Sequence, residues 1–305
     1  MSSQDHFAEE RLSGRDREMS REVSMLRSAP VSKPVSKPVE KRPCVALMGE
    51  FSAGKSTLSN LLIGADASPV NVTATQLPPV WNSRGTDAPF RVDLDGTEEP
   101  LDLAELKSVS VKGTNHIHIF HDTDRLDKFD LIDMPGISDP NMAADVWQRV
   151  IHHADVVIWC SHATQAWRQS EAAVWSTMPK ELYDRSLLLL TRMDKILSDR
   201  DRMRVIKRVE GETKGLFRKV LPVSLIKALD AEEGTAAWDD SGATELMAYL
   251  GEMVEEARTG ERVPHQDPAA ARTEATLAQD AVDTPRAKPA RIVMPTRVRP
   301  RPLQS

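Results

Sequence analysis

Short apolar runs alternate with helical patterns from Cys44 to about Arg258, and this alternation is typical of βαβ units. The four consecutive leucines at residues 187–190 indicate a strand that is buried on both faces. The pattern therefore predicts an α/β fold, with a mostly parallel central sheet and helices on both faces. We expect strands at residues 44–49, 90–94, 116–121, 129–133, 154–160, 186–191 and 220–224.

Apolar residues at helical spacing predict the helices that connect these strands. Such spacing occurs at residues 58–62, directly after the first strand, and at residues 142–151, directly before the fifth. Ser198 and Asp201 form a capping pair that predicts the start of a basic helix. One further helix, near residues 246–254, is expected after the last strand.

The two ends of the chain differ in composition from its middle. Residues 1–43 are charged and end in a Pro-Val-Ser-Lys repeat, and residues 259–305 are rich in Ala, Thr, Pro and Arg without periodicity. Such compositions predict solvated, disordered segments. We therefore expect three parts: a disordered, charged N-terminal segment with a Pro-rich linker at 1–43, a folded domain at 44–258, and a disordered basic tail at 259–305.

The net charge of -6 is distributed unevenly. Residues 1–43 carry about +2 and residues 284–305 about +6, which leaves about -14 for the residues between them. An acidic domain is not expected to bind nucleic acid directly. The basic tail predicts at most a weak, salt-dependent contact with an anionic membrane surface.

Cysteine content and hydropathy indicate the cellular compartment of the protein. Cys44 and Cys160 both lie inside apolar runs, and two cysteines exclude a disulfide framework and a four-cysteine zinc site. The N-terminus has no apolar signal region, and no run reaches the roughly 18 apolar residues that span a bilayer. We expect a cytoplasmic protein that contacts the inner face of the membrane only peripherally.

The first strand and the first helix are joined by a phosphate-binding loop motif. The glycines at 49 and 54 let the backbone wrap a phosphate, so that its N–H groups face the anion. Lys55 then reaches the β- and γ-phosphates, and the Ser56 hydroxyl ligates Mg²⁺. The motif consists of Gly49, Glu50, Phe51, Ser52, Ala53, Gly54, Lys55, Ser56 and Thr57.

Two residues at the end of a later strand are expected to complete the phosphate site. Asp133-Met134-Pro135-Gly136 follows the strand at 129–133. The Asp133 carboxylate can hold a Mg²⁺-bound water, and the Gly136 amide can contact the γ-phosphate.

The choice of base depends on residues near the last two strands. Thr191-Arg192-Met193-Asp194 places an acceptor-only carboxylate after a strand, and Asp194 can accept two hydrogen bonds from N1 and N2 of guanine, a donor pair that adenine lacks. Arg192 stands where base-binding motifs of this kind usually have a lysine. Its guanidinium can still lie over the ribose and base. Ser224 and Leu225 close the last predicted strand, where we expect backbone N–H groups to meet the base oxygen. An ATPase with a degenerate base site is the alternative.

Together these motifs resemble the P-loop GTPase superfamily. The sequences of the motifs, together with Thr75-Gln76-Leu77-Pro78, are similar to those in the G domain of bacterial dynamin-like proteins, and the resemblance covers residues 44–258. The resemblance implies that Thr75 is the switch threonine on Mg²⁺ and the γ-phosphate, with Thr73 as the alternative. It also implies that Ser52 and the Gly136 backbone organise a monovalent cation and the attacking water. Dimerisation across the nucleotide would complete the site.

The expected activity is hydrolysis of GTP to GDP and phosphate. Lys55, Ser52, Thr75 and Gly136 would be catalytic, and Ser56, Thr75 and Asp133 would hold Mg²⁺. Phe51 and Ile137 depart from the usual polar residues, which predicts slow basal turnover. The long helical stalk of membrane-remodelling dynamins has no counterpart here, so we expect a homodimer through the G domain or a helical partner protein. The alternatives are a nucleotide-sensing module without turnover, or a GTPase partner subunit in membrane or cell-envelope processes.

Overall fold

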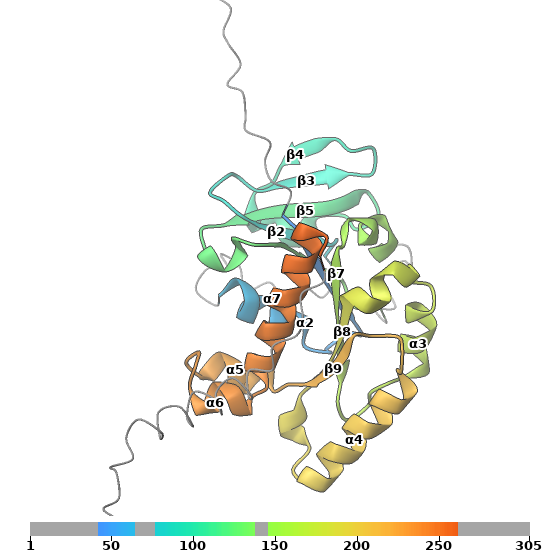
Figure 1. Cartoon of the computed structure of the whole chain (residues 1–305). Coiled ribbons are helices and arrows are strands. Elements are labelled where there is room, and N and C mark those ends of the chain that lie inside the picture. Colours follow the sequence, from blue (N-terminus) through green and yellow to red (C-terminus); the bar gives the residue numbers. More distant parts are fainter. Residues whose placement is uncertain (1–41, 65–76, 138–145, 262–305) are drawn as a thin grey trace, which may run out of the picture. The chain divides into compact units, whose positions relative to one another are not determined.

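The computed structural model describes residues 42–64, 77–137 and 146–261. Within these ranges nine strands form one sheet (Figure 1). The strands are β1 Cys44–Gly49, β2 Val80–Arg84, β3 Phe90–Asp93, β4 Glu98–Pro100, β5 Thr114–His121, β6 Asp130–Asp133, β7 Val156–His162, β8 Ser186–Thr191 and β9 Lys219–Pro222. Their order across the sheet is β4-β3-β5-β2-β6-β1-β7-β8-β9.

One half of the sheet is entirely parallel, and the other is mixed. Strands β6, β1, β7, β8 and β9 run in the same direction. Strand β2 is antiparallel to β6, and β3 is antiparallel to both β5 and β4. The carboxyl ends of the five parallel strands therefore meet at one edge of the sheet, where ligand sites of open α/β folds are found.

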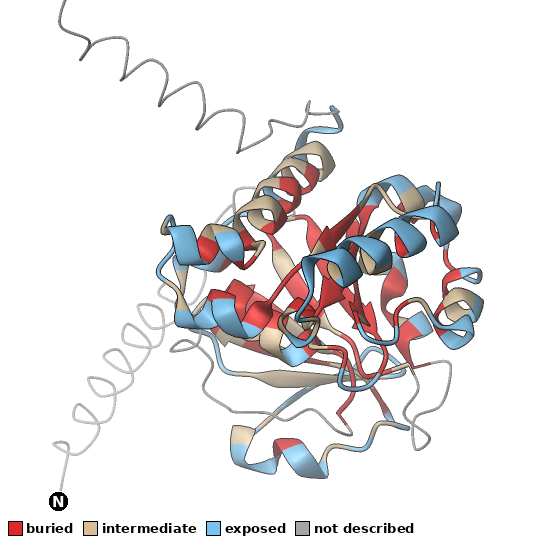
Figure 2. Ribbon diagram, turned by 90° about the horizontal axis from the view of Figure 1, so that it is seen from below, coloured by how far each residue is buried: buried red, intermediate tan, exposed pale blue. Residues whose placement is uncertain are grey.

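Helices cover both faces of the sheet. The α-helices are α2 Lys55–Ile63, α3 Gln169–Trp175, α4 Asp199–Glu212, α5 Leu225–Asp230, α6 Ala236–Asp240 and α7 Ala243–Thr259. The 3₁₀ turns are η1 Leu103–Ser108, η2 Asp124–Leu126, η3 Trp147–Arg149, η4 Ile151–His153, η5 Lys180–Arg185 and η6 Met193–Lys195. Buried residues concentrate on the strands and on the inward sides of these helices (Figure 2).

Alternate residues of the parallel strands divide between two cores. Leu187 and Leu189 of β8 pack in one core with α2, α5, α6 and α7. Leu188 and Leu190 pack in the other with η3, η4, α3, η5 and α4. All four leucines are fully buried, which confirms a strand covered on both faces. The predicted α/β fold with a mostly parallel sheet is also confirmed.

Two strands were missed by the hydrophobic pattern. Strand β2 contains Asn82 and Ser83, which are polar but buried. The Asn82 side chain donates to Leu131 O at 3.3 Å and bonds to His121 Nε2 at 2.8 Å, so hydrogen bonds from neighbouring strands replace apolar packing. Strand β4 is exposed along its whole length, and pairing with β3 alone defines it.

The predicted helix at 142–151 is wrong in its described part, since residues 142–145 lie outside the described ranges. Residues from Trp147 onward form the 3₁₀ turns η3 and η4, which are separated at Val150. The β-branched pair Val150 and Ile151 disfavours a regular helix. Arg149 also donates to the carbonyls of Val111 and Thr114, which holds this segment beside β5.

The region after the last strand contains more helix than expected. Three helices follow, not one, and α6 and α7 are separated at Gly242, which has a φ of 84°. The predicted cap of α4 is confirmed, because the Ser198 hydroxyl accepts from the Asp201 amide at 3.3 Å. In the described part of the chain, we find no helix with the length and apolar character needed to traverse a bilayer.

Candidate functional site

The phosphate-binding loop and the Asp133-to-Gly136 segment come together at the carboxyl edge of the parallel strands. The loop connects β1 to α2, and the second segment follows β6, the neighbour of β1. They enclose a small cavity of about 180 Å³. Its lining residues are Phe51, Ser52, Gly54, Lys55, Ser56, Thr57, Asp133, Met134, Gly136 and Arg192.

Two glycines are required here by close backbone contacts. A Cβ atom on Gly49 would lie 2.1 Å from the carbonyl oxygen of Cys160 on β7. A Cβ atom on Gly136 would lie 2.9 Å from Cα and N of Phe51. The Ile137 amide also donates to Gly49 O at 3.2 Å, so the two segments are joined by backbone hydrogen bonding as well.

Lys55 is buried and lines this cavity. Its Nζ donates to Gly49 O at 3.0 Å and to Glu50 O at 2.8 Å, so the loop holds its own lysine. Burial lowers the pKa of Lys55, and the nearby Asp133 opposes this shift. Burial in turn raises the pKa of Asp133 to about 6, which Lys55 partly offsets. The charge of each group therefore shifts the pKa of the other.

Thr191 connects the phosphate loop to the end of β8. Its hydroxyl contacts Ala53 O at 2.8 Å and Ser161 O at 3.3 Å. The next residue, Arg192, has a left-handed backbone with φ 57° and lines the phosphate cavity. The segment at 191–194 thus links the phosphate side of the site to the side that carries Asp194.

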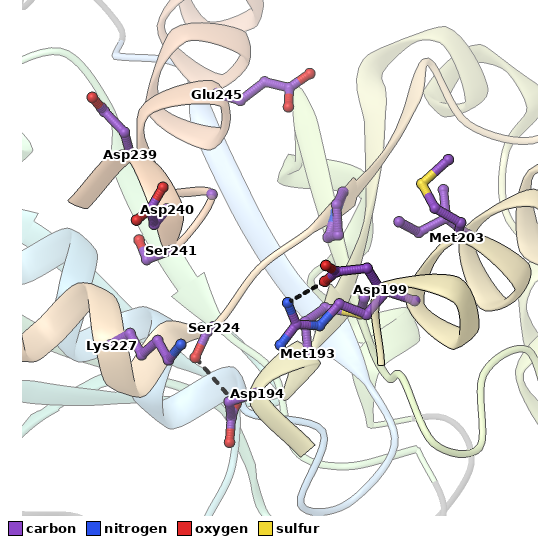
Figure 3. Close-up of a pocket in the computed structure, with 14 residues that line it drawn as sticks. Met193, Asp194, Asp199, Met203, Ser224, Lys227, Asp239, Asp240, Ser241 and Glu245 are labelled. Atoms are coloured by element: carbon purple, nitrogen blue, oxygen red, sulfur yellow. Dashed lines mark hydrogen bonds and ion pairs between the residues drawn. The ribbon is translucent and has the colours of Figure 1, made fainter. Parts of the chain in front are cut away.

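Asp194 and Ser224 line a second and larger cavity, of about 390 Å³, between α4 and the α5-to-α7 region (Figure 3). The Ser224 hydroxyl donates to Asp194 Oδ1 at 3.1 Å and so fixes the orientation of the carboxylate. Lys195 Nζ lies 3.8 Å from Asp194 Oδ2. Most charged residues around this cavity are acidic, including Asp199, Asp239, Asp240 and Glu245.

The backbone of Ser224 is engaged differently from its hydroxyl. Its amide donates to Ser241 O at 2.8 Å, so in this structure that amide bonds to the protein itself. Leu225 is buried, and its Cδ1 atom would lie 3.3 Å from a Cβ atom on Gly54. The side chain of Leu225 therefore packs against the phosphate loop, while the assignment of its backbone to the base stays a prediction.

The remaining predictions concern the switch threonine and the two apolar residues Phe51 and Ile137. Thr75 and the alternative Thr73 lie outside the described residues. Phe51 is 51% exposed at the mouth of the phosphate cavity. Ile137, which follows Gly136, packs against the core on the α3 and α4 side of the sheet. The position that usually carries a water-orienting polar side chain is thus occupied by an inward-packing apolar one.

The residues that hold the phosphate loop from the side were not predicted from the sequence. Arg168 and Ser170 both donate to the carboxylate of Glu50, and the neighbouring Glu171 is buried. The available signal was a carboxylate inside a loop whose motif predicts anion binding, since such a group needs a nearby cation or donors. Nothing in the local spacing shows that these donors lie more than a hundred residues away.

Comparison with known proteins agrees with this geometry. A model of the 50S ribosome-binding GTPase family matches residues 44–192. The matched segment contains the phosphate loop, Asp133, Gly136 and the end of β8. Residues 44–192 therefore belong to a P-loop GTPase G domain, and at the level of that family the match supports GTP binding and hydrolysis.

The chain is also homologous to a bacterial dynamin-like protein. It is 24% identical over 220 residues to Dynamin-like protein 2 of Campylobacter jejuni subsp. jejuni serotype O:23/36 (strain 81-176), covering 70% of this chain and 35% of that protein. A structure of an oligomerised bacterial dynamin pair has the same fold, with a TM-score of 0.50 at 21% identity, over 72% of this chain and 36% of that one. The chain thus spans about a third of the length of these relatives.

Proposed function

We propose that this protein binds GTP with Mg²⁺ and hydrolyses it to GDP and phosphate. The observation that carries the proposal is the cavity shared by Lys55, Ser56, Asp133 and Gly136, with Asp194 at the far end of the segment that begins at Thr191. The phosphates would lie against the loop amides and Lys55, and Asp194 would accept from guanine. Positioning and charge stabilisation supply most of the catalysis in phosphoryl transfer.

The residues of the phosphate cavity fit a magnesium ion. The Ser56 hydroxyl and the Asp133 carboxylate are hard oxygen donors on one small cavity. Mg²⁺ is usually held by one or two protein oxygens together with phosphates and waters. The described residues contain no cluster of three or more His, Cys, Asp or Glu side chains that would hold a metal without a nucleotide. Thr75 is the further expected ligand.

The proposed output is a dynamin-like switch that dimerises through the G domain. A relative of the same fold is described as an oligomerised bacterial dynamin pair, which supports association without showing it for this chain. Ile137 and Phe51 are apolar at positions where polar side chains are usual, so basal turnover would be slow. Dimerisation would then raise the turnover per molecule.

The deciding experiment measures binding of fluorescent GTP, GDP and ATP with Mg²⁺, followed by phosphate release at increasing protein concentration. We expect tight, guanine-selective binding that the Lys55→Ala protein loses. The matched control is Lys107→Ala, because Lys107 is exposed on η1, outside both cavities. A protein that binds ATP as tightly as GTP contradicts the proposal.

A second function is favoured by the inward packing of Ile137. Without a polar side chain at this position, the domain would hold GTP as a nucleotide-sensing module with negligible hydrolysis. Single-turnover kinetics separate the two proposals. Phosphate release that stays at the uncatalysed rate at every protein concentration supports the sensing module, whereas release per molecule that rises with concentration supports the dimerising enzyme.

A further inference from the structure

The carboxylate of Glu50 is engaged beside the phosphate cavity, which its side chain does not line. Glu50 is the second residue of the phosphate loop and is only 7% exposed. Its Oε2 accepts from Arg168 Nη1 at 2.5 Å, and its Oε1 accepts from the Ser170 hydroxyl. Burying a charged carboxylate costs free energy unless the charge is paired and hydrogen-bonded. These two donors therefore compensate the burial of Glu50 in the loop.

Arg168 is itself anchored at its backbone. It is the cap residue of α3, and its amide donates to Glu171 Oε2 at 2.9 Å. Glu171 is 2% exposed and accepts from Trp159 Nε1 and Ser161 Oγ of β7, each at 3.0 Å. The start of α3 is therefore fixed to the strand that lies next to β1.

The loop that leads to Arg168 is held from a second side. Arg208 of α4 donates through Nη2 to the carbonyl of Ala166. Two separate elements, β7 and α4, thus position the residues immediately before α3. The guanidinium of Arg168 meets the Glu50 carboxylate from a rigid support, although its own side chain is 44% exposed.

Glu50 also affects the lysine of the phosphate loop. Its carbonyl oxygen accepts from Lys55 Nζ at 2.8 Å, so a shift of Glu50 shifts one of the two acceptors that hold the lysine. The charge of its carboxylate is among those that oppose the burial-induced lowering of the Lys55 pKa. The backbone and the charge of Glu50 therefore both act on the group that would bind the phosphates.

We propose that Glu50, Arg168 and Ser170 form a brace that positions the phosphate loop and neutralises the Glu50 charge, so that the loop can accept a nucleoside triphosphate. Arg168 is a positioning residue in this proposal, because it acts through Glu50. An unpaired carboxylate in the loop would repel the phosphates, and a triphosphate more strongly than a diphosphate. This role rests on the proposed nucleotide binding, and Arg168 is the residue that would set the affinity for the nucleotide.

The test is a charge-rescue cycle on the full chain. Affinities for a non-hydrolysable GTP analogue and for GDP are measured for the wild type, Arg168→Ala, Glu50→Gln and the Arg168→Ala/Glu50→Gln double variant. We expect Arg168→Ala to weaken binding of the triphosphate analogue by about tenfold or more, and binding of GDP by less. Glu50→Gln should restore the double variant to within about threefold of the wild type, because glutamine keeps the side-chain shape without the charge.

Rescue separates the brace from a packing role. If Arg168 only filled space, removing the Glu50 charge would not repair its loss, and the double variant would bind as weakly as Arg168→Ala. That result overturns the proposal, as does an Arg168→Ala protein with unchanged affinity. The exposed ion pair of Glu255 and Arg258 on α7 is the matched control, and the same cycle there should leave nucleotide affinity unchanged.

Two further measurements keep the result decisive. If Arg168→Ala does not fold, Arg168→Lys keeps the charge and Arg168→Gln removes it, and the lysine protein alone should bind the triphosphate analogue within about threefold of the wild type. The cycle is also followed by urea unfolding without nucleotide. A wild type that binds no nucleotide overturns the proposed function, and effects of the two substitutions that simply add in urea overturn the brace.

Discussion

The phosphate side and the base side of the candidate site are built in different ways. On the phosphate side backbone meets backbone, as where Gly136 faces the loop at Phe51. On the base side one side chain holds another, since Asp194 is oriented by the Ser224 hydroxyl and keeps 20% of its side-chain surface exposed. Backbone contacts leave no room for a substituent, whereas a lost side-chain contact leaves the chain in place. The phosphate side should therefore determine whether a nucleotide binds, and the base side which one.

The largest effect is expected from Gly136→Ala. The added Cβ would lie 2.9 Å from backbone atoms of Phe51, which cannot move aside as a flexible side chain can. Overpacking of this kind costs roughly 1–3 kcal/mol. Because the phosphate loop must move to relieve the clash, we expect up to about a hundredfold loss of affinity for GTP and GDP alike. Fluorescent nucleotide titration measures it. Gly113→Ala is the control, since a Cβ there meets nothing within 4 Å, and equal losses in both proteins would contradict the close-contact argument.

The next effect should appear on the base side, with Asp194→Asn. An amide replaces an acceptor-only carboxylate, so hydrogen bonds to a charged group, worth about 1.5–3 kcal/mol, are lost with GTP. Binding of GTP should weaken by about tenfold or more, while xanthosine triphosphate, with a carbonyl where guanine has an amino group, should gain.

Competition titrations with GTP, xanthosine triphosphate and ATP measure the change in preference. Asp199→Asn is the matched control, because Asp199 borders the same cavity but pairs with Arg202 at 3.1 Å. An unchanged ranking of the three nucleotides in the Asp194→Asn protein would show that the base is bound elsewhere.

A smaller effect is expected on the stability of the nucleotide-free protein. The free energy of unfolding should depend on pH because of Asp133 on the phosphate side. Burial raises the pKa of Asp133 from 3.8 to about 6. The folded state then keeps a proton that the unfolded state has already released. The contribution of this group to stability is full below pH 3.8 and is lost as the pH rises through about 6. The wild-type free energy of unfolding should therefore fall, relative to Asp133→Asn, over this window.

Urea unfolding at several pH values provides this comparison, and the difference between the two proteins isolates Asp133 from other titrating groups. A difference that stays constant between pH 3.8 and 6 would mean that the carboxylate is not desolvated as described. A Mg²⁺-dependent nucleotide should bind more tightly as Asp133 loses its proton, because the ion needs the carboxylate form.

The smallest effect is expected from Ser224→Ala. One neutral donor to Asp194 is removed, and hydrogen bonds of this type contribute about 0.5–1.5 kcal/mol. GTP affinity should fall by roughly two- to tenfold, with GTP still preferred over ATP. Ser110→Ala, at an exposed position that lines neither cavity, is the control. A loss as large as that of Gly136→Ala would remove the distinction between the two sides.

Much of the fold could be predicted from the sequence, because strand and helix periodicity is local. The apolar run at β1 and the leucines of β8 predicted their strands from residues that are adjacent in the chain. Strand β2 was missed for the opposite reason, since Asn82 is buried by hydrogen bonds to β5 and β6, which are distant in sequence. The helix expected up to Ile151 failed where Arg149 ties the segment to carbonyls near β5.

For the site, the sequence by itself determined the chemistry. The order of glycines, Lys55, Asp133 and Asp194 after successive strands predicts a phosphate and base site, since these motifs require particular residues at fixed local spacing. The tertiary structure alone decided how those residues are held. The partners of Glu50 lie 118 and 120 residues away, and the contact of Gly136 with Phe51 depends on how two neighbouring strands end. Local spacing specifies which groups are available, but only packing brings distant ones within bonding distance.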